Sequence, residues 1–138
     1  MISSQTPKGM KRLLSLSILL CMISASLFAQ TAEENFYDAI FFYEEEEDYK
    51  EAQYLFNNVL SFEPNNANVK YWLGRCYNNI QGEEHKGIPY FIEATQSIAL
   101  KQKEKKYSEK RAPHHTWFYL AEAYSKINQM DEALDALN

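Results

Sequence analysis

The chain has 138 residues, with 14 basic and 19 acidic side chains and a formal net charge of −5 at pH 7. Three of the basic residues precede residue 13, so the remainder is more acidic still. Phosphate backbones and anionic lipid surfaces repel such a chain, which argues against nucleic acid as a partner and leaves only indirect contact with membranes.

Residues 1–29 read as a secretory signal peptide. A basic region is followed by an apolar stretch at residues 13–28 and by a small residue, Ala29, before the polar Gln30. This succession is typical of export signals, so we expect cleavage after Ala29 and a mature protein in the periplasm or the outer-membrane-associated cell envelope. Two alternatives stay open: a retained N-terminal anchor, and a lipid on Cys21, although the bulky residue before that cysteine does not suit lipid attachment.

Beyond residue 30 the apolar residues recur with helical spacing. Glycine and proline, four of each in the chain, fall mainly between or at the ends of the periodic stretches. The pattern predicts helices over residues 33–43, 52–60, 69–80, 87–100 and 116–128, and from residue 131 onward. Pro89 then falls in the first turn of its helix, where no hydrogen bond is lost. Residues 101–111 carry six basic and two acidic side chains, and we expect an extended, solvated part of the fourth helix and its loop.

Two short patterns recur along this helical region. Residues 72–77, Trp-Leu-Gly-Arg-Cys-Tyr, are matched by Tyr-Leu-Ala-Glu-Ala-Tyr at residues 119–124. About ten residues after each, a small residue is followed four positions later by a large apolar one, as in Gly87 and Phe91. Small residues let two helices approach closely while large ones fill the gaps between them. Because one hairpin cannot bury its apolar face alone, such self-similarity indicates an array of stacked units.

These residues resemble the tetratricopeptide repeat, whose first helix carries Leu-Gly and Tyr and whose second carries Ala and an aromatic residue. The resemblance implies an all-α fold, an antiparallel helix-hairpin solenoid that winds as a right-handed superhelix. It divides the chain into a signal peptide at residues 1–29, a first repeat at 33–66, a second at 67–100, a charged insertion at 101–112 and a truncated third repeat at 113–138. Because the third repeat stops within a helix, we expect the sequence to be a piece of a longer protein.

The same resemblance places a ligand on the concave face, which the first helix of each repeat lines. The candidate binding residues on that face are Tyr37, Phe41, Tyr71, Arg75, Asn78, Asn79, Phe118 and Glu122. Arginine and asparagine hold a peptide backbone or a carboxylate by directed hydrogen bonds, and aromatic rings supply contact area. We therefore expect a non-enzymatic scaffold for a partner protein or peptide, with the basic insertion as the next candidate surface.

No set of residues in the sequence suggests catalysis. A Gly-rich phosphate loop, a nucleophile elbow and paired cysteines are absent from it. His114 and His115 point about 100° apart on a helix, which does not suit a shared metal ion. The acidic run at residues 44–48 lacks the spacing of a calcium loop and is expected to be a solvated helix end. We expect no enzyme activity, no cofactor and no metal, and we expect Cys76 to be a small buried apolar residue.

A finer resemblance concerns the order of the segments. An exported repeat region with a charged insertion followed by Ala112-Pro113 is similar to the N-terminal part of some Gram-negative envelope proteins. In those proteins an OmpA-like peptidoglycan-binding domain follows. This resemblance implies an alternative function: a structural module of a larger envelope protein whose activity, such as peptidoglycan attachment, lies beyond residue 138.

Overall fold

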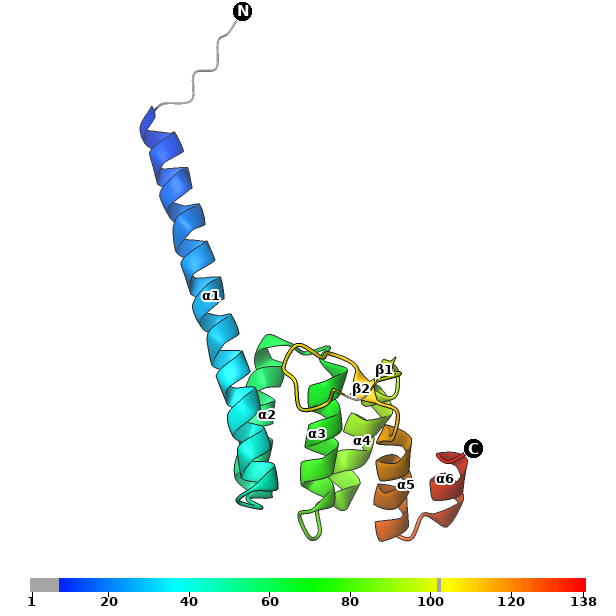
Figure 1. Cartoon of the computed structure of the whole chain (residues 1–138). Helices are drawn as coiled ribbons and strands as arrows, with labels where there is room; N and C mark the ends of the chain where they lie inside the picture. Colours follow the sequence, from blue (N-terminus) through cyan, green and yellow to red (C-terminus); the bar gives the residue numbers. More distant parts are fainter. Residues whose placement is uncertain (1–7, 102) are drawn as a thin grey trace, which may run out of the picture. The chain divides into compact units, whose positions relative to one another are not determined.

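The computed structural model describes the backbone of residues 8–101 and 103–138, and the side chains of residues 13–18, 31–101 and 103–138. The chain divides into two compact units, Met1–Thr31 and Ala32–Asn138. The helices are α1 (Lys8–Glu44), α2 (Tyr49–Phe62), α3 (Ala67–Asn78), α4 (Glu84–Ala94), α5 (Thr116–Lys126) and α6 (Met130–Asp135). Two short strands, β1 (Ile98–Ala99) and β2 (Ala112–Pro113), interrupt the series (Figure 1). The expected all-α, helix-hairpin solenoid is confirmed.

Helix α1 continues through the expected cleavage position without a break. It runs from Lys8 to Glu44, so its first part carries the expected signal peptide and its last part belongs to the repeat region. The side chains of residues 13–18 are exposed, and that of Cys21 lies outside the described residues. Over the part of the chain that the structure describes, no helix has the length and apolar character that crossing a bilayer requires. Export and lipid attachment remain predictions.

Each helical hairpin turns at one residue with a left-handed backbone. The φ angle is +52° at Glu47, +84° at Gly82 and +61° at Asn128. Side-chain caps start the next helices: Asp48 accepts a hydrogen bond from the Glu51 amide, and Asn66 accepts one from the amide three residues on. The acidic run at residues 44–48 is an exposed helix end and turn, as expected.

Helices α3 and α4 approach each other closely at two glycines. A Cβ atom on Gly74 would lie 2.6 Å from the Phe91 ring, and one on Gly87 would lie 2.8 Å from the Gly74 carbonyl oxygen. Neither position has room for a side chain while the helices keep this distance. The expected role of these two glycines in close packing is therefore seen directly.

Aromatic rings fill the core between the first two hairpins. The Phe56 ring stacks on the Trp72 ring with centroids 5.9 Å apart, and Phe36 meets Phe56 edge to face. Tyr43 also meets Trp72 edge to face at 5.2 Å. All four side chains are buried, and such pairs add to the stabilisation that apolar burial provides.

The fourth helix differs from its expected position. It begins at Glu84 and ends at Ala94, so Pro89 lies inside the helix and not in its first turn. The chain leaves the helix early because Ser97 accepts a hydrogen bond from the Ala112 amide, 2.8 Å away, and β1 pairs in parallel with β2. The insertion is therefore no extension of α4. The chain leaves the helical array at β1 and returns to it at β2, and the pairing of these two strands closes the loop.

Candidate binding groove

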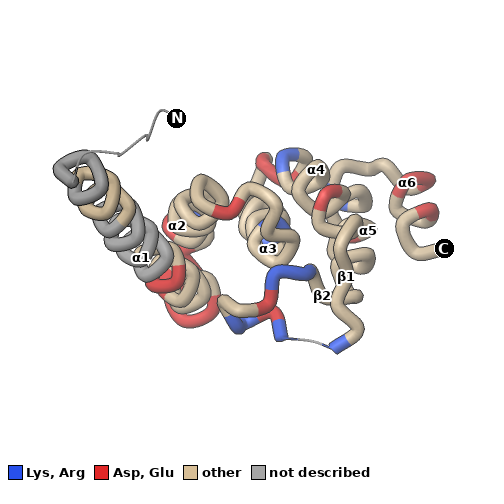
Figure 2. Tube along the Cα trace, turned by 90° about the horizontal axis from the view of Figure 1, so that it is seen from above, with Lys and Arg blue, Asp and Glu red and all other residues tan. Residues whose placement is uncertain are grey.

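The repeat pattern predicts that α3, α5 and the part of α1 after Ala32 form the concave side of the array, and we call the face that they share the groove. Viewed from above in Figure 2, these helices lie on one side of the array, and α2, α4 and α6 lie on the other. The insertion, with its basic and acidic residues, runs along the side of α1, α3 and α5. The groove therefore has a part that the insertion covers and a part that it leaves open.

The candidate residues divide by exposure. Tyr37, Phe41 and Phe118 are exposed, with 46%, 50% and 59% of their surface accessible. Asn79 is also exposed, and Arg75 and Glu122 are half-buried.

Two candidate residues are not available to a ligand as expected. Tyr71 is fully buried and Asn78 is 4% exposed. Tyr71 is covered because the Tyr119 ring from α5 and the His115 ring pack against it edge to face. Tyr71 and Asn78 are therefore covered in this structure, and a contact of either side chain with a ligand remains a prediction.

Arg75 lies at the centre of an aromatic cluster. Its guanidinium carbon is 4.7 Å from the Tyr43 and Tyr119 ring centroids, 4.8 Å from that of Trp72 and 5.6 Å from that of Tyr71. These distances are within the range of cation–π attraction, which is strongest for a desolvated cation. Among the described residues no carboxylate pairs with Arg75, and its buried Nε atom has no hydrogen-bond partner. Arg75 therefore joins three helices through ring contacts and keeps a donor unused.

A hydrogen-bonded chain extends from this cluster to the start of α5. Arg75 donates to the Tyr71 hydroxyl at 3.2 Å, and that hydroxyl lies 2.8 Å from Nε2 of His115. Burial raises the pKa of Tyr71, so the hydroxyl stays protonated and donates to a neutral imidazole. Burial likewise lowers the pKa of His115, which favours that neutral form. The chain fixes α5 against α3.

Polar side chains at the other end of α3 also join helices. Asn78 donates to Glu122 at 3.1 Å, and Lys126 donates to the Asn78 carbonyl at 2.7 Å. Asn79 donates to the Tyr43 hydroxyl at 2.8 Å, which joins α3 to α1. Asn78, Glu122 and Asn79 are therefore all partly used by the fold, although the Asn79 side chain stays exposed.

Asn68 and Trp72 face the insertion, and neither was among the predicted site residues. Both side chains donate to the Glu104 carbonyl oxygen, Asn68 at 2.8 Å and the Trp72 indole at 2.9 Å. The one available hint is their spacing of four residues, which puts both donors on one face of α3.

Two family models, each described as Tetratricopeptide repeat, match residues 43–81 and 115–138. These two segments are each similar to a tetratricopeptide repeat. The first match begins in the last turn of α1 and spans α2 and α3, and the second spans α5 and α6. No curated protein matches the chain.

The tetratricopeptide repeats carry few groups poised for chemistry. Cys76 is buried as expected, and burial raises the pKa of its thiol, so it stays protonated. His115 is hydrogen-bonded to Tyr71. Within the described part of the chain, no group of three His, Cys, Asp or Glu residues gathers in a way that would hold a metal ion.

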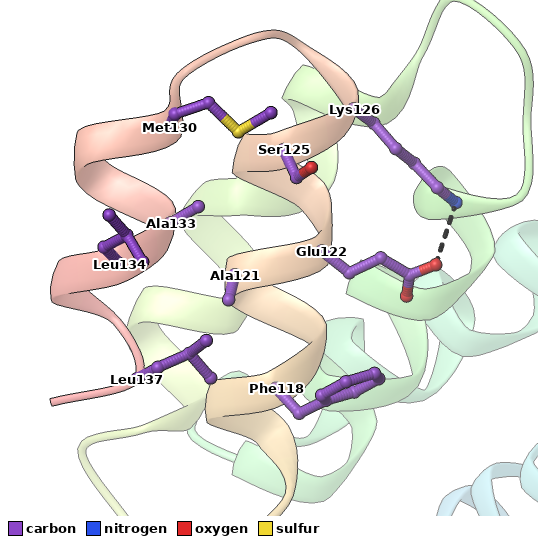
Figure 3. Close-up of a pocket in the computed structure, with 9 residues that line it drawn as sticks. All are labelled: Phe118, Ala121, Glu122, Ser125, Lys126, Met130, Ala133, Leu134 and Leu137. Atoms are coloured by element: carbon purple, nitrogen blue, oxygen red, sulfur yellow. Dashed lines mark ion pairs between the residues drawn. The ribbon is translucent and has the colours of Figure 1, made fainter.

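The last tetratricopeptide hairpin exposes an apolar surface. A cavity of about 420 Å³ lies over α5 and α6 (Figure 3). Its lining residues are Phe118, Ala121, Glu122, Ser125, Lys126, Met130, Ala133, Leu134 and Leu137. Glu122 and Lys126 form an ion pair at 3.4 Å on the α5 side. Since Phe118 and Glu122 are also candidate groove residues, this surface adjoins the open part of the groove.

Proposed function

We propose that this chain is a non-catalytic scaffold that binds a protein or peptide partner on the concave side of its tetratricopeptide repeats. Repeats of this family generally serve as interaction modules without catalytic activity. The observation that supports this site best is the set of exposed aromatic side chains there, Tyr37 and Phe41 on α1 and Phe118 on α5. Exposed aromatic residues supply much of the binding energy at protein interfaces.

The proposed contact surface is the part of the groove that the insertion leaves open. Asn79 presents an exposed amide there, and the half-buried guanidinium of Arg75 lies beside it with its Nε atom enclosed. An amide and a guanidinium bind a peptide carbonyl or carboxylate by directed hydrogen bonds. The partner is therefore proposed to place apolar side chains on the aromatic residues and a polar group above α3.

Binding can be tested with two variants of the full chain that change opposite faces of the array. The double change Phe41→Ala, Phe118→Ala removes aromatic area from the groove side. The control Tyr54→Ala removes an equally exposed ring, 61% accessible, from α2 on the other side. In capture experiments from envelope extract, the double variant should lose partners that the control keeps. Recovery of the same partners by both variants would show that the groove is not the site.

The proposed location is the cell envelope, with the chain exported to the periplasm or associated with the outer membrane. The support is the basic, apolar and small-residue succession of residues 1–29. Intact-mass measurement on protein from the native host distinguishes a cleaved signal peptide from a retained anchor and from a lipoprotein. A mass that begins at Gln30 supports export with cleavage, an uncleaved mass indicates an anchor, and a lipid adduct on Cys21 indicates a lipoprotein.

A second candidate function is that of a structural module within a larger envelope protein. The exposed apolar surface over α5 and α6 favours it, because Leu134, Leu137 and Met130 are left without an apolar neighbour that would bury them. In repeat arrays such a surface is covered by the next unit. A downstream reading frame with further repeats and an OmpA-like domain would support peptidoglycan attachment as the activity of the whole protein.

A further inference from the structure

The insertion contacts the groove mainly through its backbone. The carbonyl oxygen of Glu104 accepts hydrogen bonds from the Asn68 and Trp72 side chains. The carbonyl of Lys110 accepts them from the amides of Ala67 and Asn68, at 2.9 and 3.3 Å. These donors form a row along the first turns of α3. Because the acceptors are backbone carbonyls, this row would accept any extended peptide of suitable shape.

Two carboxylates beside the row bind lysines of the insertion. Lys105 lies 2.7 Å from Glu44 at the end of α1, and Lys110 lies 2.9 Å from Glu63 just after α2. Glu63 also accepts a hydrogen bond from the Tyr107 hydroxyl. These contacts hold the carboxylate in its charged form and lower the pKa of Glu63 although its partial burial opposes this. Two lysines of the insertion, Lys105 and Lys110, thus pair with two carboxylates outside the insertion, Glu44 and Glu63.

The insertion buries side chains only near its two ends, among the residues that the structure describes. Ala99, Ala112 and Pro113 are buried, and the β1–β2 pair closes the loop there. Between these ends, no described residue from 103 to 111 is buried. The one aromatic contact is that of Tyr107 with Phe36, with centroids 5.8 Å apart. Exposed ion pairs contribute little to stability, and segments with few buried contacts open most readily.

We propose that residues 103–111 are an internal ligand of the groove, and that an extended, lysine-bearing peptide of a partner binds the same donors after displacing them. The partner's carbonyls then take the places of those of Glu104 and Lys110, and its lysines pair with Glu44 and Glu63. In the closed state the insertion blocks this half of the groove, so the chain inhibits its own binding. The inference rests on the proposed binding function and names the chemistry of the partner.

The test replaces residues 103–111 in the full chain by a Gly-Ser linker of the same length, which keeps β1 and β2 in place. The probe is a labelled synthetic peptide with the sequence of residues 103–111, followed by fluorescence anisotropy. The linker variant should bind it saturably, at least tenfold more tightly than the intact chain, because a tethered ligand competes at high effective concentration. A control peptide with glutamate in place of Lys105 and Lys110 should bind at least tenfold more weakly. Equal weak binding by the folded linker variant and the intact chain would overturn the proposal.

A second variant covers the case in which the linker chain does not fold. Lys105→Glu with Lys110→Glu keeps the insertion but repels it from Glu44 and Glu63. Amide hydrogen exchange of residues 103–111 should accelerate while α3 stays protected, and the unmodified peptide should bind at least fivefold more tightly than to the intact chain. Unchanged exchange, or faster exchange without tighter binding, would contradict the proposal. Neither outcome bears on the test with Phe41 and Phe118, so failure here leaves the scaffold function standing.

Discussion

The α3–α4 hairpin and the α5–α6 hairpin carry the same sequence pattern but are buried very differently. The difference lies in the second helices: α4 buries Gly87, Ile88, Phe91 and Ala94, whereas α6 buries only Ala133. Helix α4 packs against both α3 and α5, whereas α6 packs against α5. The repeat pattern alone therefore does not decide how strongly a residue stabilises the fold, because burial comes from the adjacent hairpins.

The largest expected effect is a contrast between two leucines, one from each hairpin. Leu73 in α3 is fully buried, and Leu134 in α6 is 62% exposed. Leu73→Ala should lower the free energy of unfolding by about 3 kcal/mol, since it leaves a cavity in the core. Leu134→Ala should change it by less than about 0.5 kcal/mol. Denaturant unfolding of both variants measures the difference, and equal losses would show that the two hairpins are packed alike.

A somewhat smaller loss is expected at the closest helix contact. Gly74→Leu forces a side chain into the Phe91 ring, where a Cβ atom alone would already be 2.6 Å away. Overpacking of this kind costs about 1–3 kcal/mol, and more where the backbone cannot move. Thermal unfolding should show a clearly lower midpoint. The matched change Ala121→Leu, in the less enclosed hairpin, should lower it less, and the reverse order would refute the account of α3–α4 packing.

The smallest effect concerns the link between the two hairpins through His115. Burial lowers the pKa of His115 in the folded state, so the unfolded chain binds the proton more readily. The neutral imidazole therefore contributes stability above the ordinary histidine pKa of about 6.5, and this contribution is lost as the pH falls below it. Stability followed from pH 8 to pH 5 should fall more in the natural chain than in His115→Gln. A parallel decline in both would show that the Tyr71–His115 contact does not depend on protonation.

The helical framework was predictable because it depends on local pattern. Apolar spacing located the starts of α2 to α6 within a few residues, although α1 begins at Lys8 and not near residue 33. The small size of Gly74 and Gly87 indicated the close contact between α3 and α4. The end of α4 was placed six residues too late, because the hydrogen bond between Ser97 and Ala112 joins residues far apart in the sequence.

The candidate site was predicted less completely, since groove exposure depends on neighbouring elements. Tyr37, Phe41 and Phe118 were assigned to an accessible face, and they are exposed. Tyr71 has the same repeat position as Tyr37 but is buried by rings that follow the insertion, Tyr119 and His115. No local sequence pattern predicts the path of the insertion. The hydrogen bonds that hold it are accepted by backbone carbonyl oxygens, which every residue has.

Arg75 shows why the groove should be tested through exposed residues. Sequence spacing places Arg75 and Asn79 on one helix face and suggests that both can be replaced without affecting the fold. In the structure the Arg75 guanidinium packs against four aromatic rings, so its removal would disturb α1, α3 and α5 together. Phe41 and Phe118 are better probes because the core does not use them.

The most direct test of the central claim is amide hydrogen exchange on the full chain, with and without a partner captured from the envelope. If the partner binds on the concave side, protection should increase in the last turns of α1 and in α5. Over residues 103–111 exchange should become faster as the insertion is displaced. Helices α2 and α4, on the opposite side, should be unchanged. Protection confined to α2 and α4, with the groove helices unaffected, would contradict the assignment of the concave side as the binding surface.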